Sequence, residues 1–122
     1  MRRATVRTVE EISVAHYLPG YEGKCAELHG HNLKIEVKVD AEIDPATGMV
    51  IDFAEIKKIL RKYDHKLMND FMEMPTAENF AYKILNSVVD KAKNPYKVSV
   101  RVWEDENDSA EVVYIGGRNE SE

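Results

Sequence analysis

Strict alternation of apolar and polar residues marks the strands of this chain, because successive side chains of a strand point to opposite faces of a sheet. The clearest case is residues 31–43. There one face carries Leu33, Ile35, Val37 and Val39. Shorter segments at 97–104 and 111–115 alternate in the same way and predict two more strands near the end of the chain.

The first strand is predicted at residues 4–16. Val9 breaks its alternation, which predicts a bulge or bend near Glu10 and Glu11. Residues 18–23 follow with Pro and Gly and predict a loop, and residues 44–48 predict a turn after the second strand.

Two segments between the strands follow the helical period instead. Asp52 and Glu55 have the spacing of a capping box, and they open a helix. Its apolar stripe is Phe53, Ile56, Ile59, Leu60 and Tyr63. A second helix follows Thr76, with the buried face Phe80, Ala81, Ile84, Leu85, Val88 and Val89. The order β-β-α-α-β-β predicts an α+β fold, a four-stranded antiparallel sheet with both helices packed on one face.

The 122 residues predict one domain at 1–117 followed by a polar tail at 118–122. Such a sheet leaves edges that oligomerisation would cover. The net charge of −5 argues against nucleic acid as a partner, because binding to phosphate backbones needs clustered Lys and Arg. We expect no membrane span and no export segment, since no apolar run is long enough. A single cysteine, Cys25, rules out an internal disulfide and suits the reducing cytoplasm.

Three of the four histidines have a special relation to the strand pattern. His29 and His31 lie on the same face as the apolar residues of the second strand, and His16 continues the apolar face of the first. If the two strands form an antiparallel hairpin, the three rings converge. Three neutral imidazoles with an open fourth position are typical of catalytic zinc. The alternatives are ordinary hydrogen-bonded histidines, or a structural zinc site with Cys25 as fourth ligand.

Other candidate groups lie near these histidines or in loops. Cys25, beside Lys24 and close to a metal, would have the lowered pKa of a base or nucleophile; the alternative is a small buried thiol. Asp64 and His65 are adjacent, so the carboxylate can orient the imidazole for acid–base work, although such a pair is also common in polar loops.

Glu104 is unusual because its position continues the apolar face of the third predicted strand, residues 97–104. A carboxylate there needs a partner, and it could accept two parallel N–H donors from a ring such as an aminopyrimidinone. The alternative is that the strand ends at Trp103 and that Glu104 lies in solvent.

Together these motifs resemble the 6-pyruvoyl-tetrahydropterin synthase / 6-carboxy-tetrahydropterin synthase family over nearly the whole chain. The matching segments are residues 14–16, 25–32, 48–53, 64–70 and 75–79, together with Glu104.

This resemblance implies the tunnelling fold (T-fold), a homo-oligomer that is a trimer or a hexamer of two trimers, and the substrate 7,8-dihydroneopterin triphosphate. It implies zinc on His16, His29 and His31. It also implies catalysis by Cys25, Asp64 and His65, and in the family the last two often come from a neighbouring subunit. The pterin ring would bind Glu104, with Thr76 and Glu78 close to it.

The short length and residues 48–53 favour 6-carboxy-5,6,7,8-tetrahydropterin as product, the branch that feeds queuosine or archaeosine synthesis. Glu27, between Cys25 and His29, is a candidate second base, and some relatives with a glutamate here cleave the side chain to 6-hydroxymethyl-7,8-dihydropterin. The pyruvoyl product and a non-catalytic zinc-containing pterin-binding oligomer are the remaining alternatives.

Overall fold

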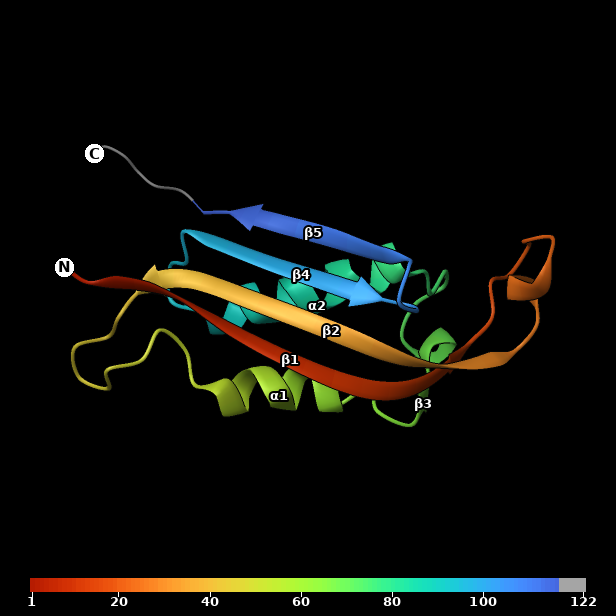
Figure 1. Ribbon diagram of the computed structural model, residues 1–122, viewed down its shortest axis with the longest axis horizontal. Coiled ribbons are helices and arrows are strands. Elements are labelled where there is room, and N and C mark those ends of the chain that lie inside the picture. Colours follow the sequence, from red (N-terminus) through yellow and green to blue (C-terminus); the bar gives the residue numbers. More distant parts are fainter. Residues whose placement is uncertain (117–122) are drawn as a thin grey trace.

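The computed structural model describes residues 1–116, so the tail expected at 118–122 lies outside the described residues. Two long strands, two helices and two short strands at the end of the chain form its two layers (Figure 1). In chain order the elements are β1 (Arg3–His16), the 3-10 helix η1 (Lys24–Ala26), β2 (His29–Glu42), α1 (Phe53–Arg61), β3 (Lys66–Leu67), the 3-10 helix η2 (Met68–Asp70), α2 (Ala77–Lys91), β4 (Lys97–Trp103) and β5 (Ser109–Ile115). The predicted element order is confirmed.

The sheet has the strand order β3-β1-β2-β4-β5. The pairs β1–β2, β2–β4 and β4–β5 are antiparallel, as predicted. The two-residue β3 is an addition, and it lies parallel to β1 beside Val14 and Ala15. A strand this short has no alternation, so the sequence pattern could not reveal it.

The predicted bulge near Glu10 and Glu11 is wrong. Each residue of β1 has one partner in β2, from Arg3 opposite Glu42 to His16 opposite His29. The alternation of apolar and polar residues only appears to break there, because Glu10 is a polar residue on the helix-facing side of β1. Its carboxylate accepts a hydrogen bond from Arg61 at the end of α1, with Nε 3.0 Å from Oε1.

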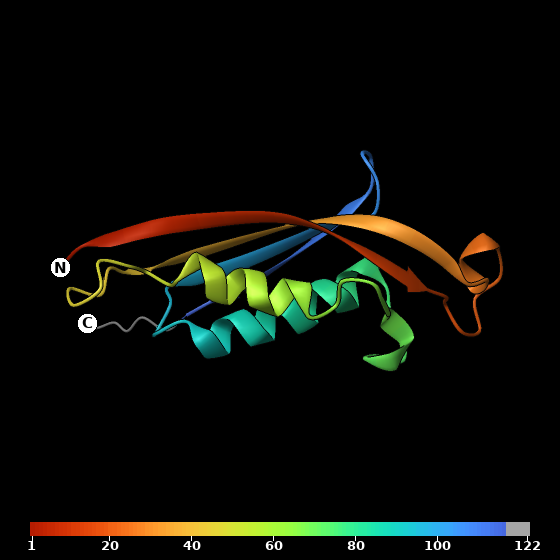
Figure 2. The same ribbon diagram turned by 90° about the horizontal axis from the view of Figure 1, so that it is seen from below.

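Both helices cover one face of the sheet (Figure 2). The side chain of Asp52 caps α1 by accepting the N–H of Ala54 at 2.9 Å. Glu55, expected to complete a capping box, instead lies 3.7 Å from the ammonium group of Lys91 on α2. The α2 helix begins after Thr76, whose hydroxyl accepts the N–H of Asn79.

The core lies between the inner face of the sheet and the two helices. It is built from the alternating positions of the strands and the apolar stripes of the helices. The side chains with no exposed surface include Ile35, Val37, Val39, Ile56, Leu60, Ile84, Val88, Val98, Val100 and Val102. No helix within residues 1–116 is long and apolar enough to cross a bilayer.

Replacing Leu60 with alanine tests how α1 is held to the sheet. Leu60 is fully buried, so Leu60→Ala leaves a cavity and should lower the free energy of unfolding by about 2–5 kcal/mol. Chemical denaturation followed by circular dichroism measures this loss. Lys58→Ala, an exposed position of the same helix, is the control and should change stability little. Equal effects of the two changes would contradict the packing described here.

Candidate metal centre

Three histidine rings meet where β1 ends and β2 begins. His16 is opposite His29, and His31 is opposite Val14, so strand pairing alone brings the rings to one face. The ring centroids are 4.6–4.9 Å apart, and the candidate ligand nitrogens all lie within 4.8 Å of one another. This group could hold a metal ion.

Backbone carbonyls orient two of the rings. Nδ1 of His16 lies 2.7 Å from the carbonyl oxygen of Pro75, and Nδ1 of His29 lies 2.6 Å from that of Glu27. A carbonyl oxygen only accepts hydrogen bonds, so each Nδ1 carries the proton and donates it. Each Nε2 is then left with a lone pair, the state in which a neutral imidazole binds a metal.

The donor set fits a tetrahedral metal. The Nε2 atoms of His16 and His29 are 3.1 Å apart. Two lone pairs at that distance repel unless a cation or a proton lies between them. Two ligands of a tetrahedral zinc, each about 2.0–2.1 Å from the ion, would be about 3.3 Å apart, which is close to the observed distance.

Burial favours the neutral ring that a metal needs. His16 is 5% exposed, and desolvation lowers its pKa, while the hydrogen bond to Pro75 opposes that shift. His31 and His29 lower the pKa of His16 further, and Glu104 raises it. The net direction is downward, so the ring stays unprotonated to lower pH than a free histidine.

Glu104 lies beside this centre. It follows β4 directly and continues the inner face of Val100 and Val102, so it is half-buried rather than in open solvent. It lines a small pocket together with His16 and Thr76. The strand ends at Trp103, as the alternative had it, but Glu104 is half-buried and lines the pocket rather than lying in solvent.

The pocket beside Glu104 is narrow in a single chain, with a volume of about 10 Å³, the space of roughly one water molecule. Thr76 is half-buried in its wall and also caps α2. Glu78 is exposed on the first turn of that helix.

Asp64 and His65 are held at the edge of β1. Asp64 accepts the backbone N–H of Ser13 at 2.9 Å, and its other carboxylate oxygen lies 3.2 Å from Nδ1 of His65. The hydrogen bond from Ser13, aided by His65, lowers the pKa of Asp64. The His65 side chain is 81% exposed, so the pair is formed but faces outward in one chain.

Cys25 and Glu27 lie on the loop between β1 and β2, which projects from the same end of the sheet as β3 (Figure 1). Cys25 is exposed in η1, so it is not the small buried thiol of the alternative interpretation. It also does not belong to the donor group formed by the histidines, as a structural zinc site would require. The Glu27 carboxylate is exposed, while its carbonyl holds His29.

Asn69 is a supporting residue that the sequence did not single out. Its side-chain oxygen accepts the N–H of Tyr17 at 3.1 Å, and its amide nitrogen donates to the Tyr17 carbonyl at 3.0 Å. Tyr17 directly follows His16, so this pair of bonds fixes the chain beside a candidate ligand. The available signal was that Asn69 falls within the motif at 64–70.

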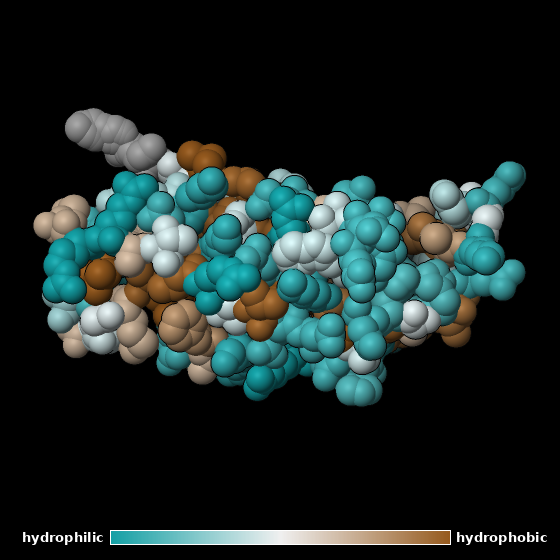
Figure 3. All heavy atoms as spheres, in the orientation of Figure 1, coloured by the Kyte–Doolittle hydropathy of each residue, from teal (hydrophilic) through white to brown (hydrophobic). Residues whose placement is uncertain are grey.

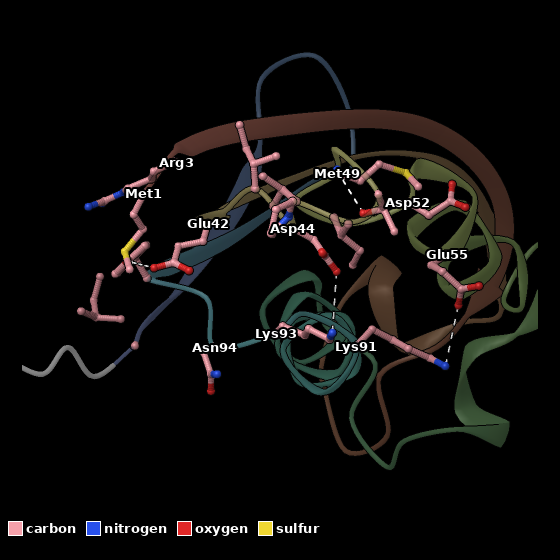
Figure 4. Close-up of a pocket in the computed structure, with 18 residues that line it drawn as sticks. Met1, Arg3, Glu42, Asp44, Met49, Asp52, Glu55, Lys91, Lys93 and Asn94 are labelled. Atoms are coloured by element: carbon pink, nitrogen blue, oxygen red, sulfur yellow. Dashed lines mark hydrogen bonds and ion pairs between the residues drawn. The ribbon is translucent and has the colours of Figure 1, made fainter.

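A larger hollow of about 1340 Å³ lies at the opposite end of β1 and β2 (Figure 4). It is lined by the start of β1, the end of β2, the turn before α1 and the end of α2. Ion pairs from Lys93 to Asp44 and from Lys91 to Glu55 cross it. This hollow is larger than the pocket beside Glu104 and lies away from the histidines.

Comparison with known proteins matches residues 5–114 to the family model described as 6-pyruvoyl tetrahydropterin synthase. A relative from Archaeoglobus fulgidus, provisionally named 6-carboxy-5,6,7,8-tetrahydropterin synthase, is 39% identical over 83% of this chain and 88% of its own. The human 6-pyruvoyl tetrahydrobiopterin synthase is 38% identical over 77% of this chain and 72% of its own.

Solved structures agree on the fold. The 6-pyruvoyl tetrahydropterin synthase of Caenorhabditis elegans superposes with a TM-score of 0.70 at 29% identity, covering 96% of this chain and 98% of its own. A Plasmodium vivax enzyme of the same name, at 20% identity, also gives 0.70 over 94% of this chain and 99% of its own. The fold is the T-fold that the family resemblance implied.

Removing one ring tests the ligand set. We expect His31→Ala to lose most of the bound metal, because two imidazoles hold a divalent ion poorly. Elemental analysis after loading with zinc and desalting measures the retained ion. His65→Ala is the matched control and should keep about one ion per chain, since that ring faces outward. Full metal content in His31→Ala would overturn the assignment.

Proposed function

We propose that this chain, which belongs to the 6-pyruvoyl tetrahydropterin synthase family, is a zinc-dependent lyase that converts 7,8-dihydroneopterin triphosphate to 6-carboxy-5,6,7,8-tetrahydropterin. The observation that carries the proposal is the three-histidine centre with the Glu104 carboxylate beside it. Relatives named for this carboxy product are matched over most of their length, 88% in Archaeoglobus fulgidus and 94% in Rickettsia typhi, against 72% for the human enzyme named for the pyruvoyl product. This product would serve as a precursor in the synthesis of queuosine or archaeosine.

The zinc would be held by His16, His29 and His31. The first two would bind it through Nε2, and His31 would bind it through the ring nitrogen that carries no proton. Bound there, zinc supplies Lewis-acid chemistry, polarising the substrate's side-chain oxygens and acidifying the neighbouring C–H and O–H groups. The Pro75 and Glu27 carbonyls keep two of the rings in the tautomer that this requires.

Glu104 would select the ring of the substrate. A pterin presents an amino group beside a ring N–H, and one carboxylate can accept both bonds in parallel. Thr76 lies in the same pocket wall, and Glu78 follows two residues later in the first turn of α2, so both would lie near the ring in the proposed complex.

Proton transfer falls to Cys25 and to the Asp64–His65 pair. Asp64 accepts from Nδ1 of His65 and so leaves Nε2 to take or give a proton at the substrate side chain. The Cys25 thiolate would serve as the second base, with Glu27 as a further candidate. The redox change occurs within the substrate, so no external redox cofactor is needed.

A neighbouring copy would complete the site. The pocket beside Glu104 is far smaller than the roughly 300–1,000 Å³ of ordinary ligand sites, and His65 faces away from its own chain. We therefore propose a homo-oligomer, a trimer or a hexamer of two trimers, in the cytoplasm, with the pterin triphosphate as the small-molecule partner and with no nucleic acid or membrane partner.

The decisive experiment is turnover of the purified zinc-loaded protein with 7,8-dihydroneopterin triphosphate, followed by mass spectrometry. We expect 6-carboxy-tetrahydropterin with acetaldehyde. A hydroxymethyl or pyruvoyl pterin would instead identify one of the sibling reactions. No turnover at full zinc occupancy would favour the non-catalytic pterin-binding oligomer.

Two variants of the loop separate its candidate bases. If the thiolate is the base, Cys25→Ala should lose most of kcat while Glu27→Gln keeps it. The reverse pattern would assign the base role to Glu27. Unchanged kcat in both variants would contradict a catalytic role for this loop, and metal content should stay at the wild-type level in each.

Glu104→Gln tests ring recognition. An amide offers only one acceptor and no charge, so kcat/KM should fall about 10–100-fold, mainly through KM, from the loss of about 1.5–3 kcal/mol. Glu106→Gln, at an exposed position two residues later, is the control and should resemble wild type. Unchanged kinetics in Glu104→Gln would remove this residue from the binding site.

A further inference from the structure

His16 is the most enclosed of the three rings in the candidate metal centre. It is 5% exposed, while His29 and His31 are half-buried. The carbonyl that orients its ring belongs to Pro75, 59 residues further along the chain, whereas His29 bonds to the carbonyl of Glu27 in its own loop. At the end of the molecule that carries this loop, the face seen in Figure 3 is mostly hydrophilic. Hydrogen bonds are therefore the contacts that can fix the chain around His16 on that side.

The chain that follows His16 is held by the side chain of Asn69. β3 pairs with β1 and ends at Leu67, where the chain turns into η2. From there the carboxamide of Asn69 accepts the N–H of Tyr17 at 3.1 Å and donates to the Tyr17 carbonyl at 3.0 Å. A carboxamide offers the same donor and acceptor as a peptide group, so it continues the strand pairing by one residue.

The carbonyl that faces the other side of His16 is held by Asn79. Nδ1 of His16 lies 2.7 Å from the carbonyl oxygen of Pro75, in the turn before α2. The preceding residue, Met74, accepts two hydrogen bonds at its own carbonyl, from the N–H of Thr76 and from the carboxamide of Asn79, each at 2.9 Å. Asn79, in the first turn of the helix, thus closes the turn that presents the Pro75 carbonyl to the ring.

We infer that Asn69 and Asn79 are positioning residues of the metal centre, which hold His16 from two sides and thereby set how tightly the three rings bind zinc. Both act through main-chain groups rather than on the ring itself. If either set of hydrogen bonds is lost, the ring spends part of its time out of its binding orientation, and the apparent affinity for the metal falls in proportion. Changes in the groups that orient metal ligands typically cost about 10–100-fold in affinity.

This inference rests on the zinc of the proposed function and adds to it the residues that govern zinc affinity. The motifs at 64–70 and 75–79 contain the two asparagines, which the proposed reaction leaves without a role. Binding of zinc alone tests the inference, with no substrate present. Its failure can therefore be told apart from a failure of the proposed reaction.

Asn69→Asp removes the donor to Tyr17 with almost no change of shape. The carboxylate still accepts the Tyr17 N–H, but its second oxygen opposes the Tyr17 carbonyl, which also only accepts. We expect the dissociation constant for zinc to rise about tenfold, as measured by competition with a chelating dye. An added negative charge near a cation would by itself strengthen binding, so a loss cannot come from the charge.

Asn79→Asp separates positioning from helix stability. Its carboxylate cannot donate to the Met74 carbonyl, so zinc binding should weaken about two- to fivefold, the effect of one exposed hydrogen bond. A negative charge in the first turn of α2 stabilises the helix, so the metal-free protein should melt at the wild-type temperature or above it. A residue that only caps the helix would show no loss of zinc affinity under these conditions.

Asn86→Asp is the matched control for both variants. Asn86 is exposed on α2, about two turns beyond Asn79. The same chemical change there should leave the dissociation constant for zinc at the wild-type value.

A comparison of double variants identifies the ring through which Asn69 acts. In a His16→Ala background the other two rings still bind zinc weakly, and Asn69→Asp should weaken that binding no further. In a His29→Ala background His16 remains a ligand, so the loss of about tenfold should persist. Equilibrium dialysis measures these weaker affinities. Equal losses in the two backgrounds would show a general effect on the fold and would overturn the inference.

Wild-type zinc affinity in both Asn69→Asp and Asn79→Asp would also overturn it, and product formation by the wild-type protein would then leave the proposed function standing. Should Asn69→Asp fail to fold, the zinc affinity and melting temperature of Asn79→Asp decide alone. A wild-type protein that binds no zinc would overturn this inference together with the zinc dependence of the proposed function.

Discussion

Fourteen consecutive cross-strand pairs join β1 to β2, and nearly everything at the candidate site depends on that unbroken register. Two antiparallel strands that pair residue by residue over their whole length bring the last residue of one beside the first residue of the other. His16 and His29 meet for this reason, and His31 joins them because it is two residues further along the same face. A single inserted residue in either strand would turn its histidines away from the core.

Hydrogen bonds from other segments then fix the rings and the backbone of the centre. The Pro75 and Glu27 carbonyls determine which nitrogen of two rings carries the proton, and Asn69 fixes the backbone next to His16. These groups come from segments far apart in the sequence, so the site is built from the fold as a whole rather than from one motif. Burial of His16 adds to the effect, since it disfavours the protonated ring that could not bind a metal.

The sequence pattern predicted the element order, the helix-covered face and the meeting of the three rings, because each follows from a period of two or 3.6 residues. It could not predict β3, which is too short to have a period. It placed a bulge at Glu10 because a polar residue on an inner face looks like a shift in parity when its partner, Arg61, is unknown. It also could not predict the orientation of Glu104. The residue after a strand can turn inward or outward, and the direction depends on tertiary contacts with other segments.

The loop between β1 and β2 carries Cys25 and Glu27, yet strand register, not the loop, sets where the three rings meet. Metal binding and the choice of base are therefore separable in this architecture. The loop can be lengthened, shortened or given another side chain while the three rings and the Glu104 carboxylate stay where they are. Relatives with this fold can therefore differ in the side chains of this one loop without any change in the scaffold that brings the rings together.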